Sequence, residues 1–394
     1  MRCIYLDHHA TTPVDPRVLD AMLPYFTARP GNAASRSHSF GWEASSAVER
    51  ARGQIARLAG AEPRDIVFTS GATESNNLAL QGATFAKGAA FAAGAPDGTR
   101  AHLITMATEH KAVLDTVRHL EATGLRTTIL PPEPDGRLDL DRLRAAILPE
   151  TILVSVMCAN NEIGALQPVA AIGAICRERG VLFHCDAAQA FGKIPIDVKA
   201  DAIDLLSVSA HKMYGPKGIG ALYVRRGVKL APQIYGGGHE NGLRSGTLNV
   251  PGIVGFGAAC ELAADEMEPD APRIRALRDR LCSLIQTVGG VRVNGGLEHR
   301  LPGNLNVSFA GVDGDALLTA IPEIAVSAGS ACTSGSDSSY VLEALGTPSE
   351  FRDCTVRFGI GRGNTAEEID YAGARVCAAV AELRAMSPVS AILS

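Results

Sequence analysis

A run of small and polar residues, TSGATESNN, occupies Thr69–Asn77 and directly follows the apolar run Ile66–Phe68. A turn of small residues between a strand and a helix exposes backbone N–H groups at the positive end of the helix dipole, and this suits a phosphate group. The simpler interpretation is a helix N-cap in which Ser70 or Thr73 satisfies those donors. Taken alone, the cluster favours the N-cap, because short motifs of this kind often arise by chance.

A second cluster, FHCDAAQ, places Asp186 at the end of another apolar run. In open α/β sheets ligands bind beyond the carboxyl ends of the strands, so a carboxylate there can pair with a protonated ring nitrogen. An aspartate that caps the following helix explains the same residue equally well. The cluster alone leaves both interpretations open.

A third cluster, SVSAHKMYGPKG at residues 207–218, carries Lys212 between an apolar run and a turn rich in Gly and Pro. A lysine at a buried strand edge is unfavourable unless it is neutral or covalently engaged, and a Schiff base with a carbonyl cofactor meets that condition. A lysine that extends to the surface is the ordinary alternative. Lys217, in the turn itself, fits that ordinary role.

The three clusters are informative mainly as a set. In chain order they supply a phosphate site, a carboxylate for a ring nitrogen and a Schiff-base lysine, all at strand ends of one α/β region. These are the groups that pyridoxal 5′-phosphate (PLP) requires from its protein. The sequence therefore predicts a PLP enzyme.

A fourth cluster, VSAGSACTSGS, places Cys332 among small residues in the later part of the chain. Such residues favour mobility and access to the thiol, and a reactive thiol must reach its target. The alternative is an incidental cysteine in a loop, and a neighbouring PLP site makes this alternative less favoured.

The elements that position these clusters follow from an alternation of short apolar runs and amphipathic stretches. Short runs that are apolar on both faces are typical of strands buried in a parallel sheet. We expect seven strands: Ile66–Thr69, His102–Met106, Thr127–Leu130, Ile152–Met157, Leu182–Asp186, Leu205–Ser209 and Ala221–Val224. Helical patterns lie between them: Trp42–Leu58, Val113–Thr123, Leu140–Ala146 and Val169–Arg179. This alternation predicts an α/β sheet with helices on both faces.

The pattern changes after Pro251 to a long helical region, Val254–Val288, followed by strands that include Asn304–Ser308 and Thr355–Gly359. This second part predicts a smaller α+β domain. With 394 residues the chain exceeds the size at which a single core stops growing. We therefore expect a large domain over residues 15–260 and a small domain made of residues 1–14 and 261–394.

The composition argues against several classes of protein. A formal net charge of -5 disfavours general binding to nucleic acid, which requires a basic surface. No apolar stretch is long enough to span a bilayer, and the first residues lack the apolar core of a secretory signal. The cysteines are scattered, odd in number and without a CxxC pair, so they predict neither a disulfide framework nor a metal site. We expect a reducing, cytoplasmic setting.

At these four clusters the chain resembles the cysteine desulfurases of the NifS/IscS type, which are class V aminotransferase-like, fold-type I PLP enzymes. The resemblance runs from YLDHHATTP at residues 5–13 to the segment Thr355–Arg362. Its motifs are FTSGATESNN, TEHKAVL, NNEIG, HCDAAQ, SAHKMYGPKGIG, GGGHENGLRSGT and GSACTSGS. The resemblance implies a large domain with a mostly parallel seven-stranded sheet flanked by helices, and a smaller α+β C-terminal domain with the catalytic cysteine loop.

The resemblance also assigns residues to the cofactor. Lys212 would form the Schiff base, Asp186 would pair with the pyridinium nitrogen, and Gln189 would bond the phenolic oxygen. His110 would stack on the ring and exchange protons. The phosphate would be held by a further group of residues: Ala72, Thr73, Ser209 and His211. Thr247 in RSGT would reach the phosphate of the neighbouring subunit, which implies a homodimer with shared active sites.

The implied substrate is L-cysteine. Arg357 would clamp its carboxylate through a bidentate fork, with Asn161 beside it, and Cys332 would accept the sulfur. The products would be L-alanine and a persulfide on Cys332, passed to an iron–sulfur scaffold or to another acceptor in thio-cofactor or tRNA synthesis. No metal is expected in the site.

Two alternative functions stay open from the sequence. A selenocysteine lyase or another PLP-dependent cysteine lyase would share the cofactor site, although a plain β-elimination needs no acceptor thiol such as Cys332. A non-enzymatic sulfur-relay subunit would be expected to lack Lys212 or Asp186, and both are present. The run after the cysteine lacks the Leu and Pro common in the family, and the chain ends at SPVSAILS without a longer polar tail. We expect these departures to affect the reach of the thiol and the docking of a scaffold protein.

Overall fold

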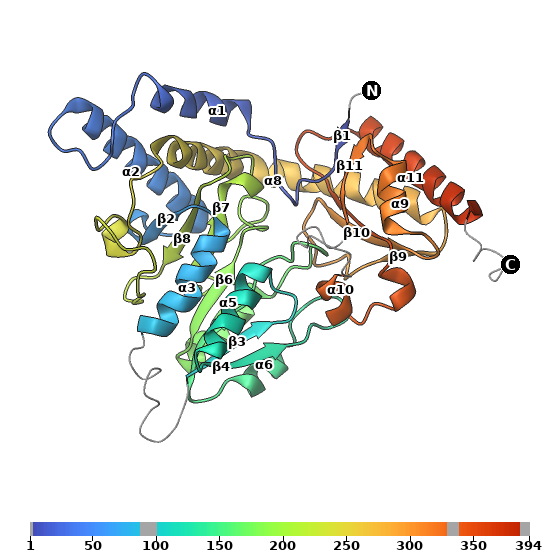
Figure 1. Cartoon of the computed structure of the whole chain (residues 1–394), viewed down its shortest axis with the longest axis horizontal. Helices are drawn as coiled ribbons and strands as arrows, with labels where there is room; N and C mark the ends of the chain where they lie inside the picture. Colours follow the sequence, from blue (N-terminus) through green and yellow to red (C-terminus); the bar gives the residue numbers. More distant parts are fainter. Residues whose placement is uncertain (1–2, 87–100, 329–338, 387–394) are drawn as a thin grey trace.

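The computed structural model describes residues 3–86, 101–328 and 339–386. At the centre of its larger part lies a seven-stranded sheet in the order β2-β8-β7-β6-β5-β3-β4 (Figure 1). Its strands are β2 (Ile66–Thr69), β3 (His102–Met106), β4 (Arg126–Leu130), β5 (Thr151–Ser155), β6 (Leu182–Asp186), β7 (Leu205–Ser209) and β8 (Gly220–Val224). Within this sheet β8 runs antiparallel to β2 and β7, and the other neighbours are parallel. The predicted mostly parallel sheet is confirmed.

One predicted strand is shorter than its apolar run. β5 ends at Ser155, whereas the sequence favoured a strand to Met157. The backbone N–H of Met157 donates to Oε1 of the buried Glu109 at 2.8 Å instead of to a neighbouring strand. A side chain that is distant in sequence therefore ends this strand.

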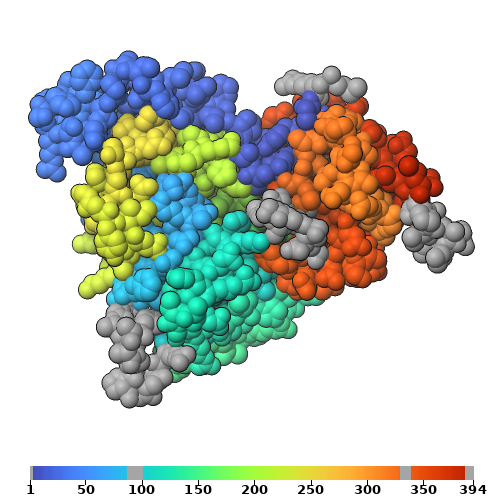
Figure 2. Space-filling model, viewed as in Figure 1, coloured from blue at the N-terminus to red at the C-terminus, as the bar shows by residue number. Residues whose placement is uncertain are grey.

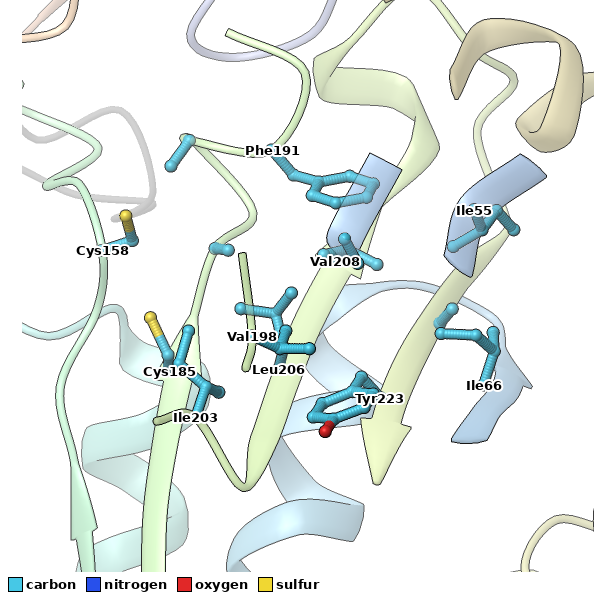
Figure 3. Close-up of a cluster of buried hydrophobic side chains, with 14 of the residues drawn as sticks. Ile55, Ile66, Cys158, Cys185, Phe191, Val198, Ile203, Leu206, Val208 and Tyr223 are labelled. Atoms are coloured by element: carbon cyan, nitrogen blue, oxygen red, sulfur yellow. The ribbon is translucent and has the colours of Figure 1, made fainter. Parts of the chain in front are cut away.

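Helices cover both faces of the sheet, because successive residues of each strand point to opposite sides. Leu205 belongs to a hydrophobic cluster beneath α3 (Ala72–Ala86) and α5 (Lys111–Ala122). Leu206 belongs to the cluster on the other face. That face is covered by α2 (Ser39–Ala59), α6 (Leu140–Ala146), α7 (Val169–Arg179) and the first part of α8, and α1 (Pro16–Met22) packs on α8. Figure 3 shows Ile55 of α2 packed near Ile66 and Tyr223 in this cluster.

The second part of the chain is built on a four-stranded antiparallel sheet in the order β12-β13-β10-β9. These strands are β9 (Val291–Val293), β10 (Asn304–Phe309), β12 (Ser327–Ala328) and β13 (Thr355–Gly359). The N-terminal strand β1 (Ile4–Tyr5) joins this part by pairing in parallel with β11 (Ile324–Ala325). Its helices are α9 (Gly314–Ala320), α10 (Tyr340–Ala344) and α11 (Ala366–Met386). The smaller α+β part of the fold is thus confirmed.

Helix α8 (Val250–Gln286) joins the two parts as one element of 37 residues. Its first half contributes Phe256 and Ala263 to the cluster of the large sheet, and its second half contributes Leu277 and Ile285 to the second core. The limit between domains at residue 260 stays a prediction. Among the described residues, no helix has the length and apolar character needed to cross a bilayer. Residues 87–99 form a stretch rich in Gly, Ala and Pro whose sequence predicts a flexible surface connection, and they lie outside the described ranges.

Candidate active site

A cavity of about 550 Å³ lies at the ends of β6 and β7 and beside the first turn of α3. Ten of the residues predicted for the site line it: Ala72, Thr73, His110, Asn161, Asp186, Gln189, Ser209, His211, Lys212 and Arg357. Thr247 is exposed and is not part of this lining. Cys332 lies outside the described residues. The structure therefore brings most of the predicted residues together from segments far apart in sequence.

The first turn of α3 forms one wall of the cavity. Ser70 and Gly71 connect β2 to this helix, and Oε2 of Glu74 accepts the backbone N–H of Ser70 at 2.8 Å. Arg244 donates to the same carboxylate at 2.9 Å, so the acidic charge in this turn is paired. Helix α3 has 15 residues, and its N-terminal N–H groups and dipole suit an anion. Thr73, Ser209 and His211 line the cavity around this turn.

Asp186 occupies the end of β6 and is held by two hydrogen bonds. Its Oδ2 accepts from Nδ2 of Asn76 at 2.7 Å, and its Oδ1 accepts from the backbone N–H of Ala188 at 2.9 Å. The side chain is buried and lines the cavity. Asn76 comes from α3 and was not assigned a role from the sequence, although it lies within the quoted FTSGATESNN motif. A carboxylate fixed in this way can accept a hydrogen bond from an N–H group of a ligand.

Lys212 follows β7 in a short 3-10 turn, Ala210–Lys212. Its Nζ donates to the backbone oxygen of His9 at 2.6 Å and to that of Ala10 at 2.7 Å. These carbonyls come from the N-terminal segment, more than two hundred residues away in sequence. Sequence reasoning missed them, because a backbone carbonyl carries no residue-type signal. They orient the amine at the cavity.

His110 and Gln189 lie on other parts of the cavity wall. His110 is the N-cap of α5, and its Nδ1 accepts the backbone N–H of Ala112 at 3.1 Å. Gln189 donates from Nε2 to the backbone oxygen of His9 at 2.9 Å. An aromatic side chain and an amide at these positions can contact the face and the edge of a flat ring ligand.

Arg357 on β13 extends from the second part of the fold to the same cavity. Its NH1 donates to the backbone oxygen of Asn161 at 2.8 Å, and its NH2 lies 3.1 Å from both Asp7 Oδ1 and Ser327 Oγ. The side chain is 2% exposed, and its Nε has no hydrogen-bond partner among the described residues. A buried guanidinium with an unused donor fits a carboxylate or phosphate ligand.

Further buried polar atoms around the cavity lack partners within the described part of the chain. They are Nε2 of His9, Oδ1 of Asn76 and Oδ1 of Asn161. Buried polar groups in folded proteins are normally hydrogen-bonded, so unpaired groups need an explanation. Asn161 lines the cavity and so does His9. The two amide oxygens are acceptors, and so is Nε2 of a neutral His9 whose Nδ1–H donates to Gln189, so a ligand with hydrogen-bond donors would account for them.

The positive charge at the cavity comes from lysine and arginine side chains, because burial keeps His9 and His211 neutral. Burial and the nearby Lys212 lower the pKa of His211 to about 4. Burial and Lys193 lower the pKa of His9 well below its usual range. Lys212 and Arg357 therefore face the cavity without competing imidazolium charges. This balance favours a negatively charged ligand.

Several thiols in the described residues are poorly suited to nucleophilic chemistry. Burial raises the pKa of Cys176 and Cys354 to about 12 and raises that of Cys260 well above its usual range. Cys3 is exposed but lies at the N-terminus. Within residues 3–86, 101–328 and 339–386, no group of His, Cys, Asp and Glu side chains is placed to hold a metal ion.

Comparisons with known proteins agree with this geometry. The aminotransferase class-V family matches residues 4–372. The protein named cysteine desulfurase IscS from Anaeromyxobacter dehalogenans (strain 2CP-C) is 58% identical over 393 residues, which cover 98% of this chain and 94% of that protein. A solved structure of a NifS-like protein has a TM-score of 0.89 at 37% identity and covers 97% of this chain and all of that one.

A further solved structure, described as SspA in complex with cysteine, has a TM-score of 0.77 at 38% identity. That match covers 91% of this chain and 98% of the other. Family, sequence and structure thus give the same answer over nearly the whole length. The chain belongs to the aminotransferase class-V family and, within it, to the cysteine desulfurases of the IscS type.

Proposed function

We propose that this protein is a PLP-dependent cysteine desulfurase, which converts L-cysteine to L-alanine and holds the sulfur as a persulfide on Cys332. The observation that carries this proposal is the meeting of Lys212, Asp186 and Arg357 at one cavity. A Schiff-base lysine, a carboxylate and a carboxylate-binding arginine are what a PLP enzyme acting on an amino acid needs. The cysteine desulfurase relatives support the choice of substrate.

The residues around the cavity fit PLP. The first turn of α3, with Ala72, Thr73, Ser209 and His211, would hold the phosphate. Asp186 would accept the hydrogen bond of the pyridinium nitrogen, and its two existing donors hold it in position for this. Gln189 would donate to the phenolic oxygen, and the ring of His110 would stack on the cofactor. When bound, PLP supplies an electron sink that stabilises negative charge at the substrate α-carbon.

The substrate carboxylate would bind Arg357 and Asn161. Arg357 is already oriented by Asp7, Ser327 and the carbonyl of Asn161, so little side-chain entropy is lost when the carboxylate binds. Its unpartnered Nε is available as a donor. The amide oxygen of Asn161 has no hydrogen-bond partner among the described residues and can only accept, so the NH2 group of the same amide is the part that would donate to the carboxylate. These two side chains would fix the amino acid with its α-carbon toward Lys212.

The side chains of this protein would carry out the proton and sulfur steps. Lys212, as the neutral amine, would take the α-proton of the substrate. The Cys332 thiolate would attack the substrate sulfur, because the thiolate and not the thiol is the nucleophile. An S–S bond forms as the C–S bond breaks, the electron pair goes to the β-carbon, which takes up a proton, and the α-carbon takes back a proton to give alanine. His110 is placed at the cavity to exchange protons in these steps.

We further propose a homodimer in which Thr247 reaches the phosphate site of the partner. Thr247 is exposed and stands apart from the cavity of its own chain. Large apolar side chains are exposed in the same region of the fold: Phe26, Phe40, Trp42 and Tyr235. Figure 2 shows the blue N-terminal elements and the yellow segment along one flank of the molecule. Exposed apolar surface of this kind suits a subunit interface.

The persulfide would be passed to an acceptor protein for iron–sulfur cluster, thio-cofactor or tRNA synthesis, in the cytoplasm. The two-domain division, residues 15–260 against residues 1–14 and 261–394, is part of the same proposal. The two hydrophobic cores, one beneath α2 and one beneath α11, support such a division.

Purified protein reconstituted with PLP tests the function directly. We expect L-cysteine to give alanine and sulfur in equal amounts, with the sulfur first bound to protein in the absence of an acceptor thiol. The measurement is alanine by chromatography and sulfane sulfur by cyanolysis in single-turnover samples. Pyruvate and free sulfide in place of alanine would identify a lyase and contradict the proposal. If the purified protein does not bind PLP, the proposal of a PLP-dependent enzyme is itself contradicted.

The contact between β8 and the turn Ser70–Gly71, which precedes α3 at the proposed phosphate site, gives a second prediction. A Cβ on Gly220 would lie 2.6 Å from the Cα of Gly71 and 2.6 Å from the oxygen of Val208. Gly220→Ala should therefore displace the turn before α3. We expect PLP affinity to fall about tenfold and the free energy of unfolding to fall by about 1–3 kcal/mol, as in other overpacked sites.

Equilibrium titration with PLP and denaturant unfolding measure the two effects of Gly220→Ala. Gly53→Ala is the matched control, since no heavy atom lies within 4 Å of its added Cβ and Gly53 is in the interior of α2. The control should leave PLP affinity unchanged and raise stability slightly. Wild-type PLP affinity in Gly220→Ala would show that the turn does not hold the phosphate.

A further inference from the structure

Lys193 lies four residues after Gln189 and does not line the main cavity. Its Nζ is 3.3 Å from Oε1 of Gln189. The side chain faces instead a small second cavity of about 50 Å³, which it shares with His8, Tyr214 and Arg362. Any effect of Lys193 on a ligand in the main cavity must therefore pass through its neighbours.

Lys193 fixes the orientation of the Gln189 amide. Oε1 of Gln189 lies within hydrogen-bond distance of both Lys193 Nζ and His9 Nδ1, the latter at 3.1 Å. Nε2 donates one hydrogen to the backbone oxygen of His9. A reversed amide would place N–H groups against the donors of Lys193, which is unfavourable. The second N–H of Nε2 is thereby left for an acceptor in the main cavity, which Gln189 lines.

The same network reaches Lys212. The backbone oxygen of His9 accepts from Nε2 of Gln189 and from Nζ of Lys212. The two lysines are thus connected through one glutamine side chain and one carbonyl oxygen. They come from different turns, one after β6 and one after β7, at the same edge of the sheet.

The charged groups that act most on Lys193 are cations. Burial is the main cause that lowers the pKa of Lys193 to about 7, and repulsion of its ammonium group by Lys212 and Arg357 adds to the effect. Its other titratable neighbours are His8, His9 and His211, whose pKa values are lowered chiefly by burial and in part by Lys193 itself. The repulsion between the ammonium groups of Lys193 and Lys212 is mutual. An anion bound in the main cavity would favour the charged form of Lys193.

The carboxylate that lines the small cavity is that of Asp270, and it is paired with cations other than Lys193. Asp270 of α8 pairs with Arg273 at 2.9 Å and with Arg362 at 3.0 Å. The guanidinium of Arg362 also packs over the ring of Tyr214, 4.5 Å from its centroid. The positive charge of Lys193 is therefore directed toward Gln189 and the cofactor site.

We propose that Lys193 is a positioning residue of the cofactor site, which orients the Gln189 amide toward the phenolic oxygen and through its charge favours the unprotonated form of the Lys212 nitrogen. This inference rests on the proposed function, because it takes PLP as the ligand of the main cavity. Lys193 itself touches neither cofactor nor substrate. It acts through Gln189 and through the electrostatic potential at Lys212.

The test is a pH titration of the visible absorbance of the substrate-free holoenzyme, which follows protonation of the Lys212–cofactor linkage. Lys193→Met removes the donor and the charge. We expect its midpoint about 0.5–1 pH unit above that of wild type, a roughly 3- to 10-fold increase in proton affinity. Lys193→Arg keeps both features and should titrate near the wild-type midpoint. Lys199→Met is the matched control, since Lys199 is exposed and paired with Glu62 at 3.3 Å.

A wild-type midpoint in Lys193→Met overturns the inference. If Lys193→Met does not accumulate as folded holoenzyme, Lys193→Gln replaces it, because glutamine keeps a donor without the charge. A wild-type midpoint there overturns the electrostatic role. The readout needs no desulfurase activity, so it is independent of the substrate. A wild-type protein without a PLP chromophore would contradict the proposed function instead.

Discussion

Replacing Lys212 with alanine is expected to abolish the visible chromophore of the bound cofactor and to reduce alanine formation at least about a thousandfold. The amine is held by two backbone carbonyls, those of His9 and Ala10, at the edge of the cavity. Among the described residues, the lysines that line the cavity are Lys212 and Lys217. Lys212 comes directly after β7, whereas Lys217 lies in the following turn. Loss of the amine removes both the covalent attachment and the base for the α-proton.

Absorbance spectra and single-turnover alanine formation measure this variant. Lys229→Ala is the control, since Lys229 is exposed, and it should keep the spectrum and the rate of wild type. The Lys212→Ala protein should still fold, because PLP can bind through its phosphate and ring contacts. A Lys212→Ala protein with the wild-type spectrum would place the Schiff base on another lysine and would refute the assignment.

Replacing Cys332 with serine is expected to give the opposite pattern. The variant should keep the PLP spectrum and lose sulfur transfer by at least about a hundredfold, because a serine hydroxyl cannot form the S–S bond that a thiolate forms. The measurement is persulfide by mass spectrometry after one turnover, together with the rate of alanine release. Spectral changes on adding L-cysteine should persist, since binding and α-proton removal depend on residues at the main cavity.

Cys3→Ser is the matched control for this experiment, because Cys3 is the exposed thiol among the described cysteines. It should leave persulfide formation unchanged. Sulfur release by Cys332→Ser at the wild-type rate would show that the thiol is not the acceptor. The chain would then have the predicted cofactor and a lyase reaction, which is the alternative that the sequence left open.

Local sequence signals predicted the large sheet and, together with the family resemblance, ten of the residues that line the cavity. Asp186 and Lys212 stand at the ends of apolar strands, where the strand pattern itself determines their position. The carbonyls of His9 and Ala10 could not be predicted, because their placement depends on long-range docking of the N-terminal segment. Asn76 and Lys193 were also missed. Asn76 acts through Asp186, which is distant in sequence, and Lys193 acts through Gln189, four residues before it. Neither residue type signals such a contact.

The reason for the error in β5 is similar. The apolar run continues to Met157, and periodicity alone predicts a longer strand. The strand ends earlier because the buried carboxylate of Glu109 takes the backbone N–H of Met157. Such a side-chain acceptor is visible only once the fold brings the turn before α5 to the end of β5.

The N-terminal segment has a consequence for the order of synthesis. β1 leaves the ribosome long before β11, yet the two strands pair at Ile324–Ala325, and the backbone N–H of His8 donates to the backbone oxygen of Gly359 at 3.1 Å. These partners are translated hundreds of residues later. A nascent chain can form the large sheet before then, since domains fold as units during translation. The carbonyls that hold Lys212 can take their final positions only after β13 has been translated, so the cofactor pocket is completed late in synthesis.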